Sequence, residues 1–377
     1  MAKQHIAIFR TGGSYIDYAT YNCQEVGLAK ALARKGYRVS VVMGGPETKH
    51  TAINYENGTV DVYYLTYRAI HQSMGIFCGW KDLLDELQPD VVQVHDMGIL
   101  MSWLVAKWAK CRGVRCVLVQ GNYETTHKPV FKQMERLFNL TFGRSLLKKV
   151  DAIGCKTQAA AEYIRHYAPA VKAPVVVTPV GLDEERFAVT DEHADIRMKY
   201  HLRGKKVLLY VGQLEPRRHP LLLLQVMQQL PDDYALLIVG AGPLTGSVKD
   251  YIKAHKLTNV VLMGKMKQDR LPAVYRAADL FLLPSSYEIF GMVILEAMYF
   301  GVPVVSYSTA GANTVIDKGT GVILPTFDAG AWRECIMEIC SDSTHLQAMK
   351  QRCAATIREK YVWDKAAANF EKLYFGK

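Results

Sequence analysis

Residues 280–298 read Leu-Phe-Leu-Leu-Pro-Ser-Ser-Tyr-Glu-Ile-Phe-Gly-Met-Val-Ile-Leu-Glu-Ala-Met. The first four residues are apolar and end at Pro284, as a short buried strand does, and the pattern from Met292 onward has helical spacing. Between them lies a loop that carries Glu288, and Glu296 falls about one turn into the helix. The stretch predicts a strand, a loop and a helix in succession, which is the repeating unit of a parallel sheet covered by helices.

The same alternation of short apolar runs and helical patterns extends along the whole chain. We expect strands at 6–9, 38–43, 60–65, 91–95, 115–120, 151–155 and 174–178, and then at 206–211, 235–239, 260–263, 280–283, 303–307 and 321–324. A chain of 377 residues is long for one core. A join near 178–181 and a closing helix at 363–374 predict an α/β protein with two doubly wound Rossmann-like domains facing across a cleft, an N-terminal one (1–180 with 361–377) and a C-terminal one (181–360).

The composition is that of a folded protein with reduced cysteines. Half of the residues are hydrophobic and 22% are charged, as in ordinary folded proteins. The eight cysteines are scattered without the spacing of a zinc site, which predicts reduced thiols. The N-terminus lacks the apolar stretch of a signal peptide, and no run is long enough to span a membrane. We therefore expect a cytoplasmic protein.

The formal net charge of +10 favours an anionic partner. Nucleic acid, a phosphorylated sugar and an anionic membrane surface all have the required charge. The sequence has no helix-turn-helix, zinc-finger or RNP-like aromatic pattern, so we expect no nucleic acid among its partners.

Two further loops follow predicted strands at the end where open parallel sheets bind ligands. The loop at 11–14 carries Gly12 and Gly13, whose backbone can approach a ligand closely. The loop at 211–220 carries Gly212 and then the adjacent Arg217 and Arg218, which suit a diphosphate because guanidinium groups make forked bonds to its oxygens. A tight turn and a solvated basic turn are the alternatives. The Gly-x-Gly-x-x-Gly pattern is absent, which disfavours a dinucleotide cofactor.

The opening stretch adds two carboxylates and a helix start to these loops. The amides of Phe290, Gly291, Met292 and Val293 lie where the predicted helix begins, and such amides attract anions. Carboxylates on either side can accept hydrogen bonds from vicinal hydroxyl groups. The Glu-x7-Glu spacing alone is weak evidence, since roughly one such pair is expected by chance. Its context predicts a site for a pyrophosphate flanked by two polyhydroxylated rings.

These residues resemble the retaining glycosyltransferases of family 4, also called group 1, which have the two-domain GT-B fold. The segment from Glu288 to Val305 is similar to the most specific segment of that family. Secondary landmarks follow in the family's order at Thr178-Pro-Val-Gly-Leu-Asp183, Tyr210-Val-Gly-Gln-Leu214, Leu237-Ile-Val-Gly-Ala-Gly-Pro243, Val260-Val-Leu-Met-Gly264 and the closing Trp363 helix. The resemblance covers nearly the whole chain.

The resemblance implies roles for individual residues. Glu296 would hold the donor ribose, Glu288 would contact the transferred sugar or steady charge beside it, and Arg217 and Arg218 would stabilise the leaving diphosphate, which makes Glu288 and the arginines the catalytic set. The donor-binding residues would be Gly12, Gly13, Gly212, Lys265, whose backbone would meet the base, Phe290, Gly291, Met292, Val293 and Glu296. His95, Asp96 and Gln120, at the ends of two strands, would lie on the acceptor side.

The chain departs from the family at two positions. Gln213 and Arg218 stand where many members carry Arg and Lys, and Arg217 is placed to supply the missing charge. Gln120 stands where a His is frequent. A glutamine can bond a hydroxyl group but cannot take a proton, so a mechanism with an enzymic base at that place is disfavoured.

The family implies transfer of a hexose-type sugar, with retention of configuration, from a UDP- or GDP-linked donor to a glycan or glycolipid acceptor. Bacterial cell-surface polysaccharide or lipopolysaccharide synthesis is the corresponding process. Arginines and helix-end amides can stabilise the leaving diphosphate, so we expect neither a metal nor another cofactor. The alternatives are a nucleotide-sugar epimerase or phosphorylase on a GT-B-like fold, and a catalytically silent sugar-nucleotide-binding module.

The stretch at 128–149 predicts a further partner. Large apolar residues there alternate with six basic ones and a single acidic one, Glu135. Such a helix can lie on an anionic membrane and bring the enzyme to a lipid-linked acceptor at the inner face of that membrane. A helix that merely covers a sheet has the same two faces, so both interpretations remain open.

Overall fold

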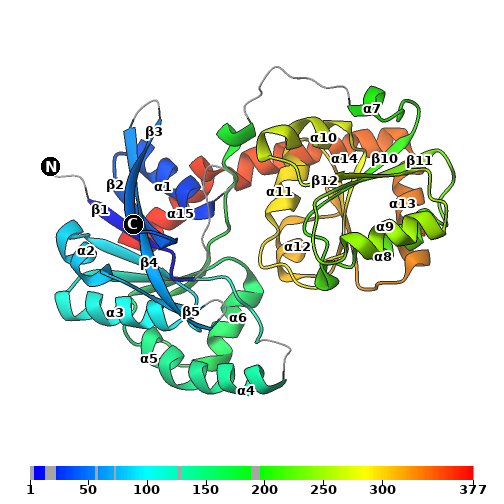
Figure 1. The fold of residues 1–377 in the computed structure, drawn as a ribbon. Coiled ribbons are helices and arrows are strands. Elements are labelled where there is room, and N and C mark those ends of the chain that lie inside the picture. Colours follow the sequence, from blue (N-terminus) through cyan, green and yellow to red (C-terminus); the bar gives the residue numbers. More distant parts are fainter. Residues whose placement is uncertain are drawn as a thin grey trace. The chain divides into compact units, whose positions relative to one another are not determined.

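The computed structural model describes residues 4–12, 23–55, 58–71, 74–125, 129–187 and 196–376 (Figure 1). The chain forms two compact units. Unit 1 comprises Met1–Gly181 and Trp363–Lys377, and unit 2 comprises Leu182–Val362. The last helix therefore belongs to the unit in which the chain begins.

The sheet of unit 1 has the order β3-β4-β2-β1-β6-β7-β8-β9, with β5 paired to β4. Its strands are β1 (His5–Phe9), β2 (Arg38–Gly45), β3 (Lys49–Tyr55), β4 (Gly58–His71), β5 (Met74–Phe77), β6 (Val91–His95), β7 (Arg115–Gln120), β8 (Ala152–Cys155) and β9 (Val175–Val177). The strands from β4 to β9 along this order pair in parallel, whereas β3 and β5 pair antiparallel to β4. The order reverses direction between β1 and β6.

The sequence did not predict β3 and β5, and it predicted a shorter β4. The side chains of β3 alternate between exposed and half-buried positions, because this strand lies at the edge of the sheet. Its residues, Lys-His-Thr-Ala-Ile-Asn-Tyr, are therefore mostly polar and do not form the apolar run that marks an interior strand.

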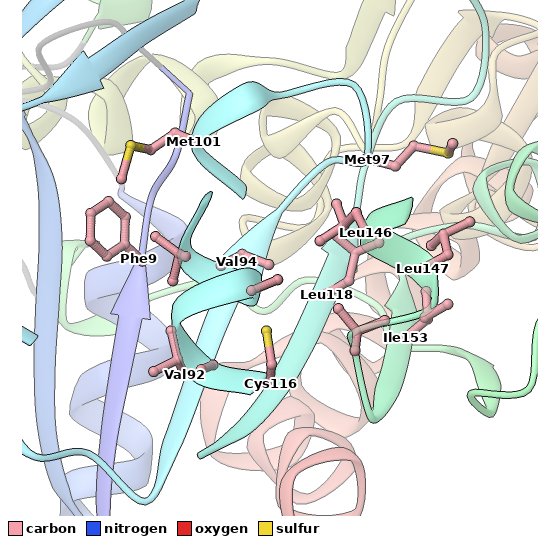
Figure 2. Packing of buried hydrophobic residues seen from close by; sticks show 14 of the residues in the cluster. Phe9, Val92, Val94, Met97, Met101, Cys116, Leu118, Leu146, Leu147 and Ile153 are labelled. Carbon is pink, nitrogen blue, oxygen red and sulfur yellow. The ribbon is translucent and has the colours of Figure 1, made fainter. Parts of the chain in front are cut away.

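The central strands of unit 1 are buried on both faces. One face packs Phe9 of β1, Val92 and Val94 of β6 and Leu118 of β7 against helix side chains such as Met101 (Figure 2). Every residue of β1 and β6 is buried. Burial on both faces explains why these strands are mostly apolar, and their polar residues, His5, Gln93 and His95, have partners inside the protein.

Helices cover this sheet. They are α1 (Gln24–Arg34), α2 (Trp80–Leu87), α3 (Leu100–Arg112), α4 (Pro129–Phe138), the π-helical η1 (Asn139–Gly143), α5 (Arg144–Leu147), α6 (Gln158–Tyr167) and α15 (Trp363–Phe375). In Figure 1, α15 lies beside α1. The two helices approach closely, because a Cβ atom at Gly27 would lie 2.1 Å from Nε1 of Trp363. Ion pairs from Arg34 to Asp364 and from Lys35 to Glu371 hold the exposed side of this contact.

The sheet of unit 2 is parallel throughout, with the order β12-β11-β10-β13-β14-β15. Its strands are β10 (Lys206–Val211), β11 (Tyr234–Val239), β12 (Val260–Gly264), β13 (Leu280–Leu283), β14 (Val304–Tyr307) and β15 (Gly321–Leu324). The first three strands of this unit extend the sheet in one direction and the next three extend it in the other. The two neighbours at the reversal are β10 and β13, with Leu208 paired to Leu280.

The helices of unit 2 are α7 (Ile196–Lys199), α8 (Pro220–Met227), α9 (Thr245–Ala254), α10 (Leu271–Ala277), α11 (Met292–Tyr299), α12 (Ala310–Val315), α13 (Ala329–Ser341) and α14 (Ser343–Thr356). Short 3₁₀ turns occur at η2 (Glu184–Phe187), η3 (Pro216–Arg218) and η4 (Gln268–Arg270), and η5 (Ile357–Tyr361) is π-helical. The buried face of α8 and α13 packs Leu223, Leu224, Trp332 and Ile336 on the sheet. Pro220 begins α8, where the missing N–H of proline has no cost.

Candidate functional site

The loops after β10 and β13 lie side by side in unit 2. Because these strands are neighbours at which the strand order reverses, the loops leaving their carboxyl ends flank the place where open parallel sheets bind ligands. Arg217 and Arg218 lie in the first loop, and Glu288 lies in the second. The fold thus brings the two adjacent arginines close to a glutamate that is 70 positions from Arg218 in the chain.

Arg218 is the centre of this cluster. Its Nη1 atom pairs with Oε1 of Glu288 and also donates a hydrogen bond to Oγ of Ser285 at 3.3 Å. Its Nε atom lies 3.5 Å from Oε1 of Glu215. That contact has the distance of an ion pair but not the direction of a hydrogen bond, since neither atom has a hydrogen-bond partner in the described part of the chain. A positive charge is therefore held between two carboxylates.

Arg217 lies beside it and is more exposed. Its Nε atom forms an ion pair of 2.8 Å with Oε1 of Glu215, and its Nη1 atom donates to the carbonyl oxygen of Tyr287 at 3.0 Å. In return, the backbone N–H of Ser286 donates to the carbonyl oxygen of Arg217 at 2.9 Å. These contacts join the two loops, so the guanidinium groups are held in place by the loop that carries Glu288.

Burial affects the charge of Glu288. The residue is 8% exposed, and burial raises its pKa, while the neighbouring Arg218 and a hydrogen bond from Ser285 act in the opposite direction. A carboxylate in this environment gains most from a neighbouring cation, because low solvent access strengthens the attraction. The ionised form of Glu288 therefore depends on its contacts with this cluster.

Glu296 lies in α11 in a different environment, where its partners among the described residues include no cation. Its Oε2 atom accepts a hydrogen bond from the hydroxyl group of Tyr275 at 2.9 Å, and its Oε1 atom accepts one from Nε2 of Gln268 at 3.2 Å. Burial raises the pKa of Glu296 to about 7. Each oxygen keeps a lone pair, so the carboxylate can still accept a further hydrogen bond.

The helix start between the two glutamates has a specific shape. Gly291 has a φ of 76°, a left-handed conformation that favours glycine, and α11 begins at Met292. The loop is backed by α12, because a Cβ atom at Gly311 would lie 2.5 Å from the backbone of Phe290. Phe290 and Met292 have buried side chains, and Val293 is half-buried. The contribution of the amides at 290–293 to anion binding stays a prediction.

Glycines bring neighbouring loops close to the β10 loop. Gly240, which has a φ of 135°, would place a Cβ atom 1.9 Å from the carbonyl oxygen of Gly212. A Cβ atom at Gly242 would lie 2.5 Å from the carbonyl oxygen of Leu214. The segment from Gly240 to Gly242 therefore packs backbone against backbone on the loop that leads to the arginines. Lys265, exposed after β12, follows the next strand in this direction.

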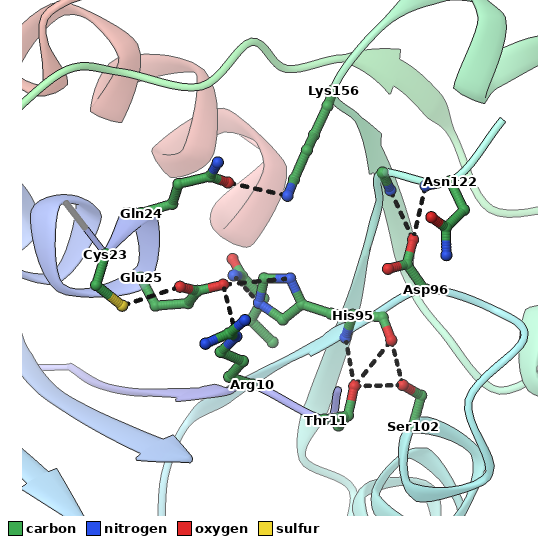
Figure 3. Close-up of polar contacts among 12 residues, drawn as sticks. Arg10, Thr11, Cys23, Gln24, Glu25, His95, Asp96, Ser102, Asn122 and Lys156 are labelled. Carbon is green, nitrogen blue, oxygen red and sulfur yellow. Dashed lines mark hydrogen bonds and ion pairs between the residues drawn. The ribbon is translucent and has the colours of Figure 1, made fainter. Parts of the chain in front are cut away.

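The corresponding edge of unit 1 lies at β1 and β6 (Figure 3). The Oγ1 atom of Thr11, after β1, donates to the carbonyl oxygen of His95 at 2.8 Å and lies 2.7 Å from Oγ of Ser102. Ser102 also donates to the carbonyl oxygen of His95. Gly12 follows Thr11, whose hydrogen bond to His95 links the ends of β1 and β6. Gly13 lies outside the described residues.

His95 is buried, and both of its ring nitrogens face protein groups (Figure 3). Its Nε2 atom lies 3.0 Å from Nε2 of Gln93, and its Nδ1 atom lies 4.0 Å from Oε1 of Glu25. Burial lowers the pKa of His95 to about 4, so the ring is neutral at physiological pH. Gln93 in turn accepts a hydrogen bond from Tyr374 of α15.

Glu25 is the charged partner in this cluster. Burial alone would raise its pKa, but Arg10, His95 and Lys156 outweigh that effect and lower the pKa to about 2. Arg10 lies 3.9 Å from the carboxylate. The edge of the sheet therefore carries an ionised glutamate beside a neutral histidine.

Asp96 and Gln120 join the loops after β6 and β7. Asp96 accepts hydrogen bonds from the amides of Gly121 and Asn122 at 2.7 and 3.0 Å. The side chain of Gln120 accepts from the amide of Met97 at 2.9 Å and donates to the carbonyl oxygen of Asn122 at 2.7 Å. These side chains are engaged with the backbone, and contact of His95, Asp96 or Gln120 with an acceptor stays a prediction.

The sequence analysis missed several residues that hold the predicted ones. In unit 2 they are Glu215, Gln268, Tyr275, Ser285 and Ser286, and in unit 1 they are Arg10, Thr11, Gln24, Glu25, Ser102 and Lys156. Tyr275 and Gln268 belong to no recognisable motif. Thr11 and Glu215 lie in the loops at 11–14 and 211–220, and the two serines follow β13 in the stretch 280–298, so polarity after a buried strand was the available signal for these residues.

The described residues contain no group of three or more His, Cys, Asp or Glu side chains arranged to hold a metal ion. No helix within the described ranges is long and apolar enough to cross a membrane. The eight cysteines are free thiols, of which Cys78 and Cys111 are exposed.

Two family models match the chain in succession. The model for glycosyltransferase family 4 matches residues 26–186, and the model for group 1 glycosyl transferases matches residues 193–356. Alpha-D-kanosaminyltransferase of Streptomyces kanamyceticus is 25% identical over 67% of this chain and 65% of that protein. D-inositol 3-phosphate glycosyltransferase of Mycobacteroides abscessus is 29% identical over 52% of this chain and 46% of that protein. The match spans about half to two thirds of the length of these relatives.

Solved structures share the fold across nearly the full chain. Sucrose-phosphate synthase from Thermosynechococcus elongatus has a TM-score of 0.78 at 20% identity, covering 99% of this chain and 98% of that one. The Anabaena protein HepE in complex with UDP-glucose has a TM-score of 0.71 at 16% identity, covering 97% and 98%. The doubly wound units are therefore those of the GT-B fold, which confirms the predicted fold class. The chain belongs to the group 1 glycosyltransferases of family 4.

Proposed function

We propose that this glycosyltransferase transfers a hexose-type sugar from a UDP- or GDP-linked donor to a glycan or glycolipid acceptor with retention of configuration. Bacterial cell-surface polysaccharide or lipopolysaccharide synthesis is the process that fits such an acceptor. The observation that carries the proposal is the cluster of Arg217, Arg218 and Glu288 at the strand reversal of unit 2. The complex of HepE with UDP-glucose supports a nucleotide-sugar donor for this fold.

In this proposal, unit 2 holds the donor. Arg217 and Arg218 bind the diphosphate, and their positive charge stabilises the negative charge that develops on the leaving group. Glu288 contacts the transferred sugar and Glu296 accepts hydrogen bonds from the ribose. Positive charge develops on the sugar at the same time. An ionised Glu288 beside the sugar would stabilise that charge.

Retention follows if the acceptor attacks the face from which the diphosphate leaves. A departing phosphate oxygen then receives the proton of the acceptor hydroxyl group, so the mechanism needs no enzymic base at Gln120. The arginines already supply cationic charge, and we expect transfer to continue in excess chelator. Loss of activity in chelator, with recovery on adding Mg²⁺, would contradict this part of the proposal.

Ligand binding and product stereochemistry test the proposal. UDP, GDP and ADP are compared by thermal shift, and we expect a rise in the melting temperature with one of them. Arg218→Ala should abolish that rise, whereas Arg352→Ala, a change at an exposed arginine of the same unit, should leave it unchanged. NMR of the product should show the anomeric configuration of the donor. An inverted product would exclude the retaining mechanism.

Assays of the same purified protein distinguish a glycosyltransferase from the three alternatives. An epimerase would convert the nucleotide sugar without an acceptor, and a phosphorylase of this fold would show the absorbance of lysine-bound pyridoxal phosphate. A silent binding module would bind the nucleotide without turnover. We expect none of these three results, because the arginine cluster and both glutamates are present in one unit.

We further propose that α4 and η1 contact an anionic membrane at its cytoplasmic face. Five large apolar side chains are exposed on these two elements, at Phe131, Met134, Leu137, Leu140 and Phe142. Exposed basic residues, Arg136 and Lys148 among them, lie in the same stretch. Apolar and basic side chains together suit the interface of a bilayer that contains anionic lipid. Such binding would place the enzyme beside a lipid-linked acceptor.

Vesicle co-sedimentation tests this surface with a matched control. Met134→Glu should weaken binding to vesicles that contain anionic lipid. Met198→Glu changes a methionine of similar exposure in unit 2, 58% against 63%, and should not. Lys148→Glu should reduce binding only when anionic lipid is present. Equal binding of all variants and the wild type would contradict the proposal.

A further inference from the structure

Ser285 is a buried polar residue between Arg218 and Glu288. It is 0% exposed and lies two residues after the end of β13. Its Oγ atom accepts a hydrogen bond from Nη1 of Arg218 at 3.3 Å, and the same side chain lowers the pKa of Glu288 by favouring the ionised carboxylate. One hydroxyl group thus bonds the guanidinium group of the ion pair and acts on the charge of the carboxylate.

Ser286, the next residue, has the same chemistry but different partners. Its amide and its Oγ atom donate to the carbonyl oxygen of Arg217 at 2.9 and 3.1 Å. It therefore holds the backbone of the arginine loop and contacts neither Arg218 nor Glu288 among the hydrogen bonds of the described residues. Of these two adjacent serines, only Ser285 bonds the side chain of Arg218 within the described residues.

We propose that Ser285 is a positioning residue, which fixes the guanidinium group of Arg218 and the carboxylate of Glu288 in the geometry that receives the diphosphate and the sugar. The inference rests on the proposed function of these two residues. An arginine side chain has many rotamers, and ordering it on ligand binding has an entropic cost that a preformed hydrogen bond reduces. A hydrogen bond to an ionised group is also stronger than one between neutral groups.

Ser285→Ala and Ser286→Ala form the test. The nucleoside diphosphate that binds the wild type best among UDP, GDP and ADP is compared with its monophosphate by calorimetry. We expect Ser285→Ala to reduce the preference for the diphosphate by roughly tenfold, because the loss falls on Arg218, which we propose binds the diphosphate. Ser286→Ala should keep most of that preference.

The pH profile of kcat gives a second measurement that a merely structural role would not move. Without the hydroxyl group of Ser285, the ionised form of Glu288 loses a hydrogen bond and the pKa of Glu288 rises. The acidic limb of the profile should therefore move to higher pH in Ser285→Ala and stay in place in Ser286→Ala.

Two outcomes would overturn the inference. The first is an unchanged preference for the diphosphate in Ser285→Ala, including the case in which the affinity for both nucleotides falls equally. The second is an acidic limb that does not move. If the wild type binds no nucleoside diphosphate, the proposed function itself fails, and this inference fails with it, which separates that case from the other two.

Discussion

The hydroxyl group of Tyr275 lies 2.9 Å from Oε2 of Glu296, and both residues are buried. Tyr275 comes from α10 and Glu296 from α11, so the contact joins two helices of unit 2. Gln268 provides the only other hydrogen bond to this carboxylate among the described residues. A buried carboxylate held by two neutral donors is costly to ionise, because no cation offsets its loss of hydration.

Replacing the tyrosine should destabilise the protein. Tyr275→Phe removes one of these donors, and leaving a buried acceptor without its partner costs about 1–3 kcal/mol. The free energy of unfolding, measured in urea, checks this prediction. Tyr251→Phe is the control, because that hydroxyl group bonds Gln228 at the exposed surface, and it should change stability by less than about 0.5 kcal/mol. Equal effects of the two changes would contradict the prediction.

Stability should depend on pH through Glu296. Burial raises the pKa of this residue to about 7 from an ordinary value of 4.5. Between these values the folded protein binds a proton that the unfolded chain has released, so the free energy of unfolding falls as pH rises. The contribution of Glu296 is fully present below pH 4.5 and should be lost by pH 7 or slightly above, with a total on the order of 3 kcal/mol.

Comparison with Glu296→Gln isolates this effect, because the variant cannot titrate at this position. As the pH rises from 5 to 7.5, the free energy of unfolding of the wild type should fall relative to that of the variant. A difference that stays constant over this range would show that Glu296 titrates normally.

The two arginines should differ in importance. Arg218 contacts Glu288 and Ser285 and has a side chain that is 17% exposed, whereas the side chain of Arg217 is 45% exposed. Arg218→Ala should lower kcat by about 10²–10³-fold, which is typical for a lost electrostatic donor. Arg217→Ala should cost roughly tenfold, because solvent screens a more exposed charge. Steady-state kinetics with the identified donor measures both, and a larger loss for Arg217 would contradict the assignment.

Replacing Gln120 should lower the stability of the folded protein. Its side-chain oxygen accepts from the buried amide of Met97, so Gln120→Leu leaves that amide unpaired at a cost of about 1–3 kcal/mol. Urea denaturation measures this loss. Gln158→Leu, at an exposed position of α6, should be nearly neutral. An unchanged stability in Gln120→Leu together with a weaker affinity for the acceptor would instead favour direct contact with the sugar.

The fold could be predicted from the sequence because interior parallel strands are buried on both faces and are therefore rich in apolar residues. That pattern located β1, β6, β10 and β13, whose ends carry the candidate residues. It failed for β3, because an edge strand with one exposed side has no such run. The return of α15 to unit 1 was indicated by its position after the last strand and by its resemblance to the closing helix of the family.

The amino-acid sequence alone determined the residue types and their local setting. It put Glu288 in a loop, Glu296 on a helix and two arginines at a strand end, because each of these follows from nearest neighbours along the chain. Only the tertiary structure decided that Arg218 pairs with Glu288 while Glu296 has neutral partners. The two carboxylates are 8 positions apart in sequence, yet burial and partners contributed by distant segments give them different electrostatic environments.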